Sequence, residues 1–235
     1  MSVFVPLTKI PNFDPQTVPI KSWDAHLPAL PVSEFALTAL QKRFANPPAW
    51  QPEVREEPPF TDRKPREAAV LIAIVMHLES AGGPAVLLTL RSDALSTHSG
   101  QIAFAGGKLD EGETAHEAAL REAHEEIGLP ASYVQVLGNL PRYTTGTAFH
   151  ITPVVAAVRP GFKLQANPAE VAEVFEVPLS FLMNPANHAR HAFEFEGHHR
   201  EWFSMPWQDV EAGKKRFIWG ATAGMLRNLY RFLSF

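Results

Sequence analysis

Three glutamates are the residues whose spacing points most directly to chemistry. Glu122, Glu125 and Glu126 stand three and four positions apart, so their carboxylates share one face if the segment is helical. A solvated acidic face would explain such a cluster, but repulsion within it costs roughly 0.5 kcal/mol or more when nothing lies between the charges. Crowded carboxylate oxygens suit a hard divalent cation and favour Mg²⁺ or Mn²⁺ over zinc. The cluster is therefore a candidate metal site.

The residues around the glutamates predict the elements that position them. Thr114 followed by Glu117 forms a capping box, which predicts a helix over residues 114–127. Three glycines precede the helix and allow close backbone approach to a ligand: Gly106, Gly107 and Gly112. The opposite helix face carries small or apolar residues that can pack on a sheet: Ala118, Ala119, Ala123 and Ile127.

Over 23 residues, from position 107 to position 129, the sequence resembles a complete Nudix box. Its fixed positions are Gly107, Glu113, Arg121, Glu122, Glu125, Glu126 and Gly128, with apolar Ala123 and Leu129. At residue frequencies of about 5–7%, seven such matches arise by chance about once in a million chains. The resemblance implies an enzyme, a pyrophosphohydrolase that cuts a diphosphate linkage in a nucleotide derivative. It also implies an α/β (α+β) fold, a Nudix-like α/β/α sandwich with a mixed central sheet.

The resemblance assigns the metal-binding and catalytic roles within the box. Glu122 and Glu126 would be the main ligands of Mg²⁺ or Mn²⁺, and Glu125 would be a third ligand or the group that deprotonates water. A backbone carbonyl at Gly106 would complete part of the coordination. The metal would neutralise charge on the diphosphate and lower the pKa of the attacking water. Glu122 and Glu125 are thus predicted to be catalytic as well as metal-binding.

Other positions are predicted to hold the box in shape or to complete it from outside. Arg121 would pair with Glu113 and tie the loop to the helix. The glycines with a structural role in the motif are Gly107 and Gly128. Family members often use a further carboxylate outside the box, for which Glu170 and Glu173 are candidates, and Glu173 is preferred as the catalytic residue. The alternative is a solvated carboxylate at a strand edge.

The segment before the box indicates a substrate. Residues 87–107 resemble the motif that precedes the box in coenzyme A diphosphatases, although Ser96 and Ala105 replace an arginine and a proline of that motif. The residues that carry the resemblance are Leu87, Leu88, Thr89, Arg91, Ser92, Gly100, Phe104, Gly106 and Gly107. Residues 149–155, 173–179 and 218–223 continue it. The predicted substrate contacts are Arg91, His98, Phe104 and Lys108.

The predicted reaction is hydrolysis of coenzyme A to 3′,5′-ADP and 4′-phosphopantetheine. A first alternative is another Nudix hydrolase, acting on ADP-ribose, NADH or a nucleoside triphosphate. A second, of a different class, is a non-catalytic Nudix-fold module that only binds nucleotides. Intact glutamates at positions 122, 125 and 126 favour an enzyme over this module. Four histidines, which we expect near the surface rather than as a metal-ligand set, are His188, His191, His198 and His199.

The chain divides by composition into two parts. Residues 1–66 are rich in proline and are predicted to form an arm that packs on a domain, with one helix at residues 32–44 that Ser33 could cap. A partly disordered leader is the alternative. Residues 67–235 would form the Nudix hydrolase domain. Strands are expected at residues 68–76, 85–91, 133–140, 151–158, 191–195 and 201–205, and a second helix at residues 221–232. Glu196 and Gly197 could turn the last two strands into a hairpin.

Bulk properties exclude several classes of partner. The net charge of −4 gives no electrostatic footprint for nucleic acid, so the expected partner is a small nucleotide. The chain contains no cysteine, which removes disulfides and thiolate nucleophiles. The longest apolar run, residues 68–76, is about half of what a membrane span requires. We therefore expect a cytoplasmic protein without a membrane partner, and a homodimer remains an open alternative.

Overall fold

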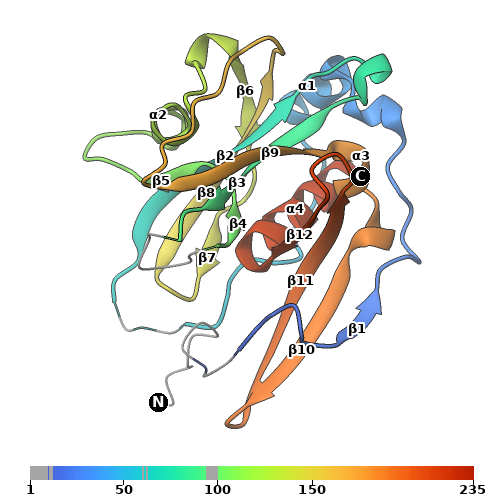
Figure 1. Ribbon diagram of the computed structural model, residues 1–235, viewed down its shortest axis with the longest axis vertical. Coiled ribbons are helices and arrows are strands. Elements are labelled where there is room, and N and C mark those ends of the chain that lie inside the picture. Colours follow the sequence, from blue (N-terminus) through green and yellow to red (C-terminus); the bar gives the residue numbers. More distant parts are fainter. Residues whose placement is uncertain (1–9, 11–12, 60, 62, 94–99) are drawn as a thin grey trace.

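The protein is built from two β-sheets with helices packed on and between them (Figure 1). The computed structural model describes residues 10, 13–59, 61, 63–93 and 100–235. The helices are α1 (Leu37–Ala45), α2 (Ala115–Ile127), α3 (Leu179–Leu182) and α4 (Gly220–Leu233). Within the described residues, no helix is long and apolar enough to cross a membrane.

The larger sheet is mixed, which confirms the predicted fold class. Its strands are β2 (Arg66–Val75), β3 (Ala85–Arg91), β4 (Ile102–Ala103), β5 (Gly106–Lys108), β6 (Val134–Asn139), β7 (Tyr143–Thr145), β8 (Phe149–Val158) and β9 (Val171–Pro178). The main path runs β4-β3-β2-β8-β6, with β5 paired to β2, β7 to β8 and β9 to β3. Strands β2 and β8 run parallel, whereas the other described pairs of this sheet are antiparallel.

The structure contains a second, antiparallel sheet, and the sequence patterns did not predict that the strands divide into two sheets. Its order is β1 (Ile20–Trp23), β10 (Ala189–Phe195), β11 (His198–Asp209) and β12 (Lys214–Trp219). The predicted β10–β11 hairpin is present. Glu196 and Gly197 have φ angles of 48° and 76°, which suit a tight two-residue turn. Because β1 comes from the proline-rich arm, the arm supplies a strand of this sheet.

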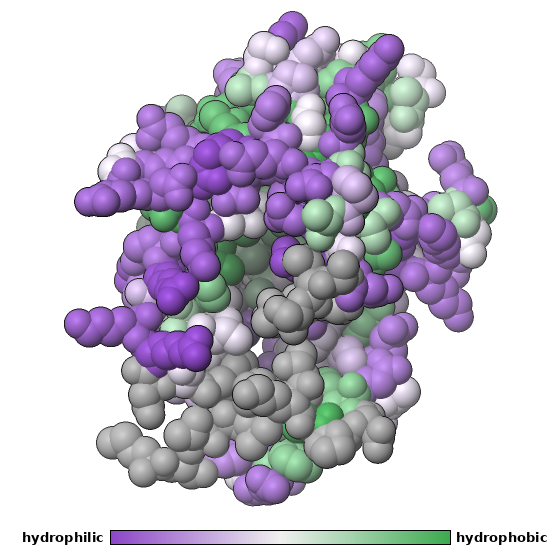
Figure 2. Space-filling model, turned by 60° about the vertical axis from the view of Figure 1, so that its left-hand side comes forward, coloured by the Kyte–Doolittle hydropathy of each residue, from purple (hydrophilic) through white to green (hydrophobic). Residues whose placement is uncertain are grey.

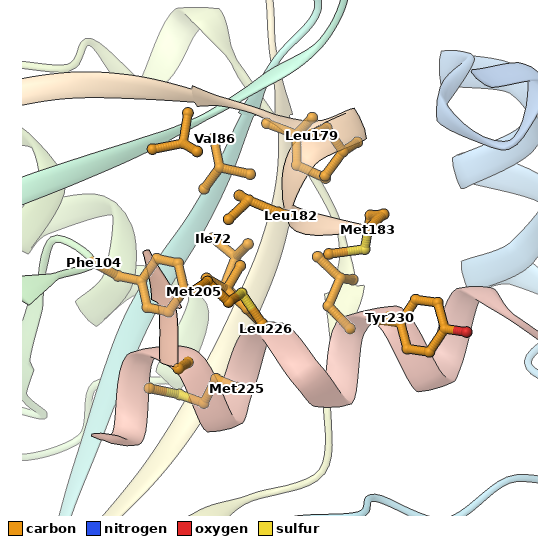
Figure 3. Close-up of a cluster of buried hydrophobic side chains, with 14 of the residues drawn as sticks. Ile72, Val86, Phe104, Leu179, Leu182, Met183, Met205, Met225, Leu226 and Tyr230 are labelled. Atoms are coloured by element: carbon orange, nitrogen blue, oxygen red, sulfur yellow. The ribbon is translucent and has the colours of Figure 1, made fainter. Parts of the chain in front are cut away.

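Successive side chains of β2 point alternately into two separate hydrophobic layers, one on each side of the strand. Its odd-numbered residues Ala69, Leu71 and Ala73 pack under α2, because that helix presents Ala119, Ala123 and other small side chains. Its even-numbered residues Ile72 and Ile74 face a second core, formed with α4 and the smaller sheet (Figure 3). That core includes Val86, Phe104, Leu182, Met205, Leu226 and Tyr230. Helix α2 and its glutamates therefore rest on one side of the larger sheet.

The described part of the arm packs on the rest of the protein, but its helix differs from the expectation. Residues 32–35 form a 3₁₀ turn, and α1 starts only after it. Ser33 does not cap α1, because the residue at the cap position is Ala36, which offers no side-chain hydrogen bond. Phe44 of α1 packs against the ring of Phe232 at 4.7 Å and sits above Gly138, where a side chain would leave it no room. A disordered leader does not describe these residues.

A buried network of charges joins the arm to the second sheet and α4. Asp24 accepts hydrogen bonds from Arg190 at 2.8 Å and pairs with Arg227 at 2.9 Å, while Glu53 pairs with the same two arginines. Burial alone would raise the pKa of Asp24 and Glu53, but the arginines outweigh it and hold both pKa values below their ordinary range. Burial and the charge of Arg227 lower the pKa of the adjoining His188 to about 4, so His188 is neutral.

We expect Asp24→Asn to lower the free energy of unfolding by about 3 kcal/mol, because it leaves the buried Arg227 and the partly exposed Arg190 with only Glu53 as a paired carboxylate. Urea denaturation measures this. Since both carboxyls have folded pKa values below their usual 3.8 and 4.5, the stabilisation is complete above that range and is lost as the pH falls through the folded values. The control is Lys21→Gln, which breaks a pair with side chains 58% and 52% exposed and should cost less than about 1 kcal/mol. Equal losses in both variants would contradict the network's role.

Candidate active site

Helix α2 is fixed at both ends by the local features of its sequence. The predicted capping box is present: the Thr114 hydroxyl accepts from the backbone N–H of Glu117, and the Glu117 carboxylate accepts from that of Thr114. The helix ends at Gly128, whose φ of 68° is in the left-handed region that favours glycine. The backbone N–H groups of Gln165 and Asn167 then bond the carbonyls of the last helical turn.

The three glutamates differ sharply in exposure. The side chains of Glu126, Glu122 and Glu125 are 4%, 15% and 53% exposed. Glu126 is therefore placed against the sheet, where its Oε2 accepts a hydrogen bond of 3.2 Å from the backbone N–H of Gly106. A gradient from buried to exposed runs across the acidic face, rather than a uniformly solvated surface.

Strand β5 brings the glycine loop into contact with these carboxylates. Gly106 and Gly107 pair with Val70 and Ala69 of β2. A Cβ atom on Gly107 would overlap the Glu122 carboxylate, and one on Gly106 would overlap the backbone of β2. At Gly106 the obstacle is backbone, so only glycine fits there, whereas a side chain at Gly107 would have to displace the Glu122 carboxylate. The loop backbone therefore lies directly beside two carboxylates.

The carboxylates repel one another across this small space. Burial, reinforced by the negative charges of Glu122 and Glu170, raises the pKa of Glu126 to about 7, although the Gly106 N–H and Arg91 oppose the shift. Burial likewise raises the pKa of Glu122, with Glu125 and Glu170 adding to it. A nearby positive charge would stabilise all of these carboxylates in their charged form.

Arg121 ties the acidic face to the preceding loop. Its Nε and Nη2 donate to the Glu113 carboxylate at 2.8 and 2.9 Å, which lowers the pKa of Glu113 to about 2. The remaining guanidinium hydrogens reach Glu122 at 2.9 Å, Glu125 at 3.1 Å and the backbone carbonyl of Lys108 at 3.0 Å. One side chain thus connects α2, the loop and β5.

Of the two acidic candidates outside the helix, the structure brings only Glu170 to the glutamate cluster. Its negative charge raises the pKa of both Glu122 and Glu126, and its carbonyl accepts from the N–H of Ser92 at 2.9 Å. Glu173 is held by Arg216 and Lys214 of β12, at 2.7 and 2.8 Å, and these bonds lower its pKa to about 2. The sequence preference for Glu173 over Glu170 does not match this geometry.

The predicted substrate contacts occupy different places. Arg91, at the end of β3, lies 4.0 Å from Glu126, and Lys108 is exposed on β5. Phe104 borders the same space but is 3% exposed and belongs to the core. His98 lies outside the described residues. His188 and His191 are not at the surface as expected: they are buried and bond to backbone carbonyls and to Arg227 or Ser204.

A cavity of about 860 Å³ extends from the glutamates to the second sheet. Glu122, Glu126, Glu170 and Arg91 line one part of it. Other parts of its wall come from the arm, β7, β11, β12 and the start of α4: Glu57, Pro58, Tyr143, Arg200, Trp202, Trp219 and Met225. Figure 2 shows the molecule hollowed near the centre of the view, with hydrophobic residues deep in the hollow and hydrophilic ones along its left side. Sequence reasoning missed this wall because its residues carry no motif.

Comparison with known proteins identifies the fold that holds this site. The model of the NUDIX domain family matches residues 65–217. The chain belongs to the Nudix hydrolase family. It is similar to Nudix hydrolase NudL of Enterobacter sp. (strain 638) and of Escherichia coli (strain K12), each 40% identical over 166 residues that cover 70% of this chain and 81% of the relative. Both relatives are described as uncharacterized Nudix hydrolases.

Solved structures include similar chains as well. RenU, a Nudix hydrolase from M. smegmatis, is 31% identical over 50% of this chain and 73% of its own, with a TM-score of 0.42. The family model and the NudL relatives identify the glutamates, the two glycines and Arg121 described above as the Nudix box of a Nudix hydrolase, an enzyme that acts on phosphoric anhydride bonds.

Nudix hydrolases generally use divalent metal ions, and the donor set of this box fits one. Its side chains are hard carboxylate oxygens. Burial, to which their mutual repulsion adds, raises the pKa of Glu122 and Glu126, so positive charge is stabilising here. Within the described residues, no three acidic or histidine side chains already converge as a ready metal cage. Glu122 and Glu125 are engaged by Arg121 in this structure.

We expect Mg²⁺ at about 100 times its dissociation constant to raise the free energy of unfolding by about 2.7 kcal/mol. Glu126→Gln should lose most of this gain, because it removes a charged ligand at nearly constant shape. Thermal unfolding with and without Mg²⁺ measures the difference. Glu173→Gln is the matched control and should keep the full gain. An undiminished Mg²⁺ effect in Glu126→Gln would show that this carboxylate is no ligand.

Proposed function

We propose that the protein hydrolyses the diphosphate linkage of coenzyme A with the help of Mg²⁺ or Mn²⁺. One observation carries the reaction type: an almost fully buried carboxylate, Glu126, borders a large cavity beside a glycine backbone and further carboxylates. A carboxylate placed in this way is costly unless a cation binds it. The products would be 3′,5′-ADP and 4′-phosphopantetheine.

The ligands would come from the box itself. Glu122 and Glu126 would hold the ion, with Glu125 and the carbonyl of Gly106 as further donors. When bound, the ion neutralises the diphosphate and makes the attacking water more acidic. Arg121, which engages Glu122 and Glu125 in the structure, would keep its bonds to Glu113 and so preserve the loop.

Residues outside the box would orient the substrate and take up a proton. Arg91 and Lys108 both line the cavity, and their positive charges would attract the phosphates. Water adds its oxygen to one phosphorus atom, the bridging P–O bond breaks, and a carboxylate accepts the proton of the water. Glu170 and Glu125 are the candidates for that base, because Glu170 lies near Glu122 and Glu126 and Glu125 is the most exposed of the three helix glutamates.

Two features support coenzyme A as the substrate. Residues 87–107 resemble the coenzyme A diphosphatase motif and supply β3, β4 and the start of β5, which border the cavity. The cavity volume of about 860 Å³ lies in the upper range of small-molecule sites, as a long substrate requires. ADP-ribose, NADH and nucleoside triphosphates remain the alternatives that experiment must separate.

The direct test is a substrate panel with product chromatography. With Mg²⁺ or Mn²⁺ present, we expect coenzyme A to be turned over in preference to ADP-ribose, NADH and nucleoside triphosphates. Glu126→Gln should lower kcat by about 100-fold or more while the melting temperature stays near that of the wild type. Preference for another nucleotide would replace the substrate, whereas near-normal turnover by Glu126→Gln would refute the ligand assignment.

Glu170→Gln and Glu173→Gln form a pair that locates the outside carboxylate. We expect Glu170→Gln to lower kcat by about 10-fold or more, because general-base catalysis contributes about 100-fold or more. Glu173→Gln should keep kcat but lower the melting temperature, since it breaks bonds to Arg216 and Lys214. Steady-state kinetics and thermal unfolding measure both. A lower kcat in Glu173→Gln, with unchanged kcat in Glu170→Gln, would instead assign the role of outside carboxylate to Glu173.

A further inference from the structure

The wall of the cavity opposite the Nudix box is made by the second sheet. Arg200 and Trp202 of β11, together with Trp219 at the end of β12, line the same cavity as Glu126. We infer that this wall is a subsite for a nucleobase and a phosphate carried on its ribose. The inference rests on the proposed function in one respect: the diphosphate lies at the carboxylates of α2, so the nucleoside half extends toward β11.

Two donor atoms without partners mark the two ends of such a ligand. Among the described residues, the buried side-chain nitrogens with no hydrogen-bond partner are Arg91 Nε and Trp202 Nε1. Both residues line the cavity, Arg91 beside the Nudix box and Trp202 at the second sheet. Buried donors are rarely left unpaired in folded proteins, so this pair points to an elongated ligand with acceptors at both ends.

Trp202 belongs to a cluster of aromatic side chains against which a flat ligand ring could pack. Its indole is parallel to the His191 ring, with centroids 5.4 Å apart, and meets Trp219 edge-on at 6.2 Å. A nucleobase offers both a face for contact with indole rings and ring nitrogens or carbonyls that accept from Nε1. Because Nε1 is buried, the indole must turn slightly to reach such an acceptor, and its fluorescence should respond to binding.

Arg200 supplies positive charge beside these rings. It is 7% exposed, and burial lowers its pKa because the attraction of Glu57 does not offset the loss of solvent. Glu57 already accepts from the Tyr143 hydroxyl and the Gly146 N–H. Arg190 lines the same cavity, but Asp24 and Glu53 compensate its charge. Arg200 thus places a positive charge on this wall of the cavity, where a ligand phosphate can meet it.

The test measures binding of the nucleoside half alone, in EDTA, so that it does not depend on turnover. Calorimetry gives the affinities of 3′,5′-ADP, AMP and 4′-phosphopantetheine. We expect 3′,5′-ADP to bind about 10-fold more weakly to Trp202→Phe, which keeps a ring but removes the N–H. Arg200→Gln should remove the preference for 3′,5′-ADP over AMP. Affinity for 4′-phosphopantetheine should not change.

Trp23→Phe is the matched control, because Trp23 lies on β1, is 44% exposed and does not line the cavity. It should bind all three compounds as the wild type does. Unchanged 3′,5′-ADP affinity in both Trp202→Phe and Arg200→Gln, with native melting temperatures, would overturn the subsite. If Trp202→Phe does not fold, the preference measured with Arg200→Gln decides the question, and Arg200→Lys should retain part of that preference.

The two proposals can fail separately. Weakened 3′,5′-ADP binding in the variants, in a protein that does not cleave coenzyme A, would keep the subsite and reject the substrate. Cleavage of coenzyme A with the same KM in wild type, Trp202→Phe and Arg200→Gln, together with unchanged binding, would keep the substrate and reject the subsite.

Discussion

The hydrogen bond from the Gly106 N–H to the buried Glu126 carboxylate is the interaction on which the site depends. It requires β5 to approach α2 so closely that a side chain at Gly107 would have to displace the Glu122 carboxylate. It also requires α2 to lie flat on the sheet, which its small alanines permit. The result is a carboxylate that burial and its acidic neighbours leave poorly stabilised, with a pKa raised to about 7. The positive charge of a bound metal ion would stabilise this carboxylate in its charged form.

Two other parts of the structure complete the surroundings of this carboxylate. Beyond α2, the bonds from Gln165 and Asn167 to its last carbonyls hold the chain that delivers Glu170. On the far side of the cavity, the arm and the second sheet complete the wall. The charges of Asp24, Glu53, Arg190 and Arg227 join these parts, so the described part of the proline-rich segment packs on the domain and borders the cavity.

Local patterns were sufficient to predict the parts of the fold that are locally encoded. The capping box, the helix of the Nudix box, the β10–β11 turn and the apolar strands β2, β3 and β8 follow from neighbouring residues. The second sheet does not, because β1 and β12 are short and mix charged or polar residues with apolar ones, and Asp24 and Arg190 are 166 positions apart. The preference for Glu173 over Glu170 did not match the geometry for the same reason. Only the pairing of β9 with β3, and the distant Arg216, decide which carboxylate reaches the site.

Anomalous diffraction from crystals soaked with Mn²⁺ tests the central claim most directly. The account predicts a manganese peak between the carboxylates of Glu122 and Glu126, within coordination distance of the Gly106 backbone, and Glu122 turned away from Arg121. A peak elsewhere, or none at millimolar Mn²⁺ with Glu126 still bonded only to the Gly106 N–H, would contradict it.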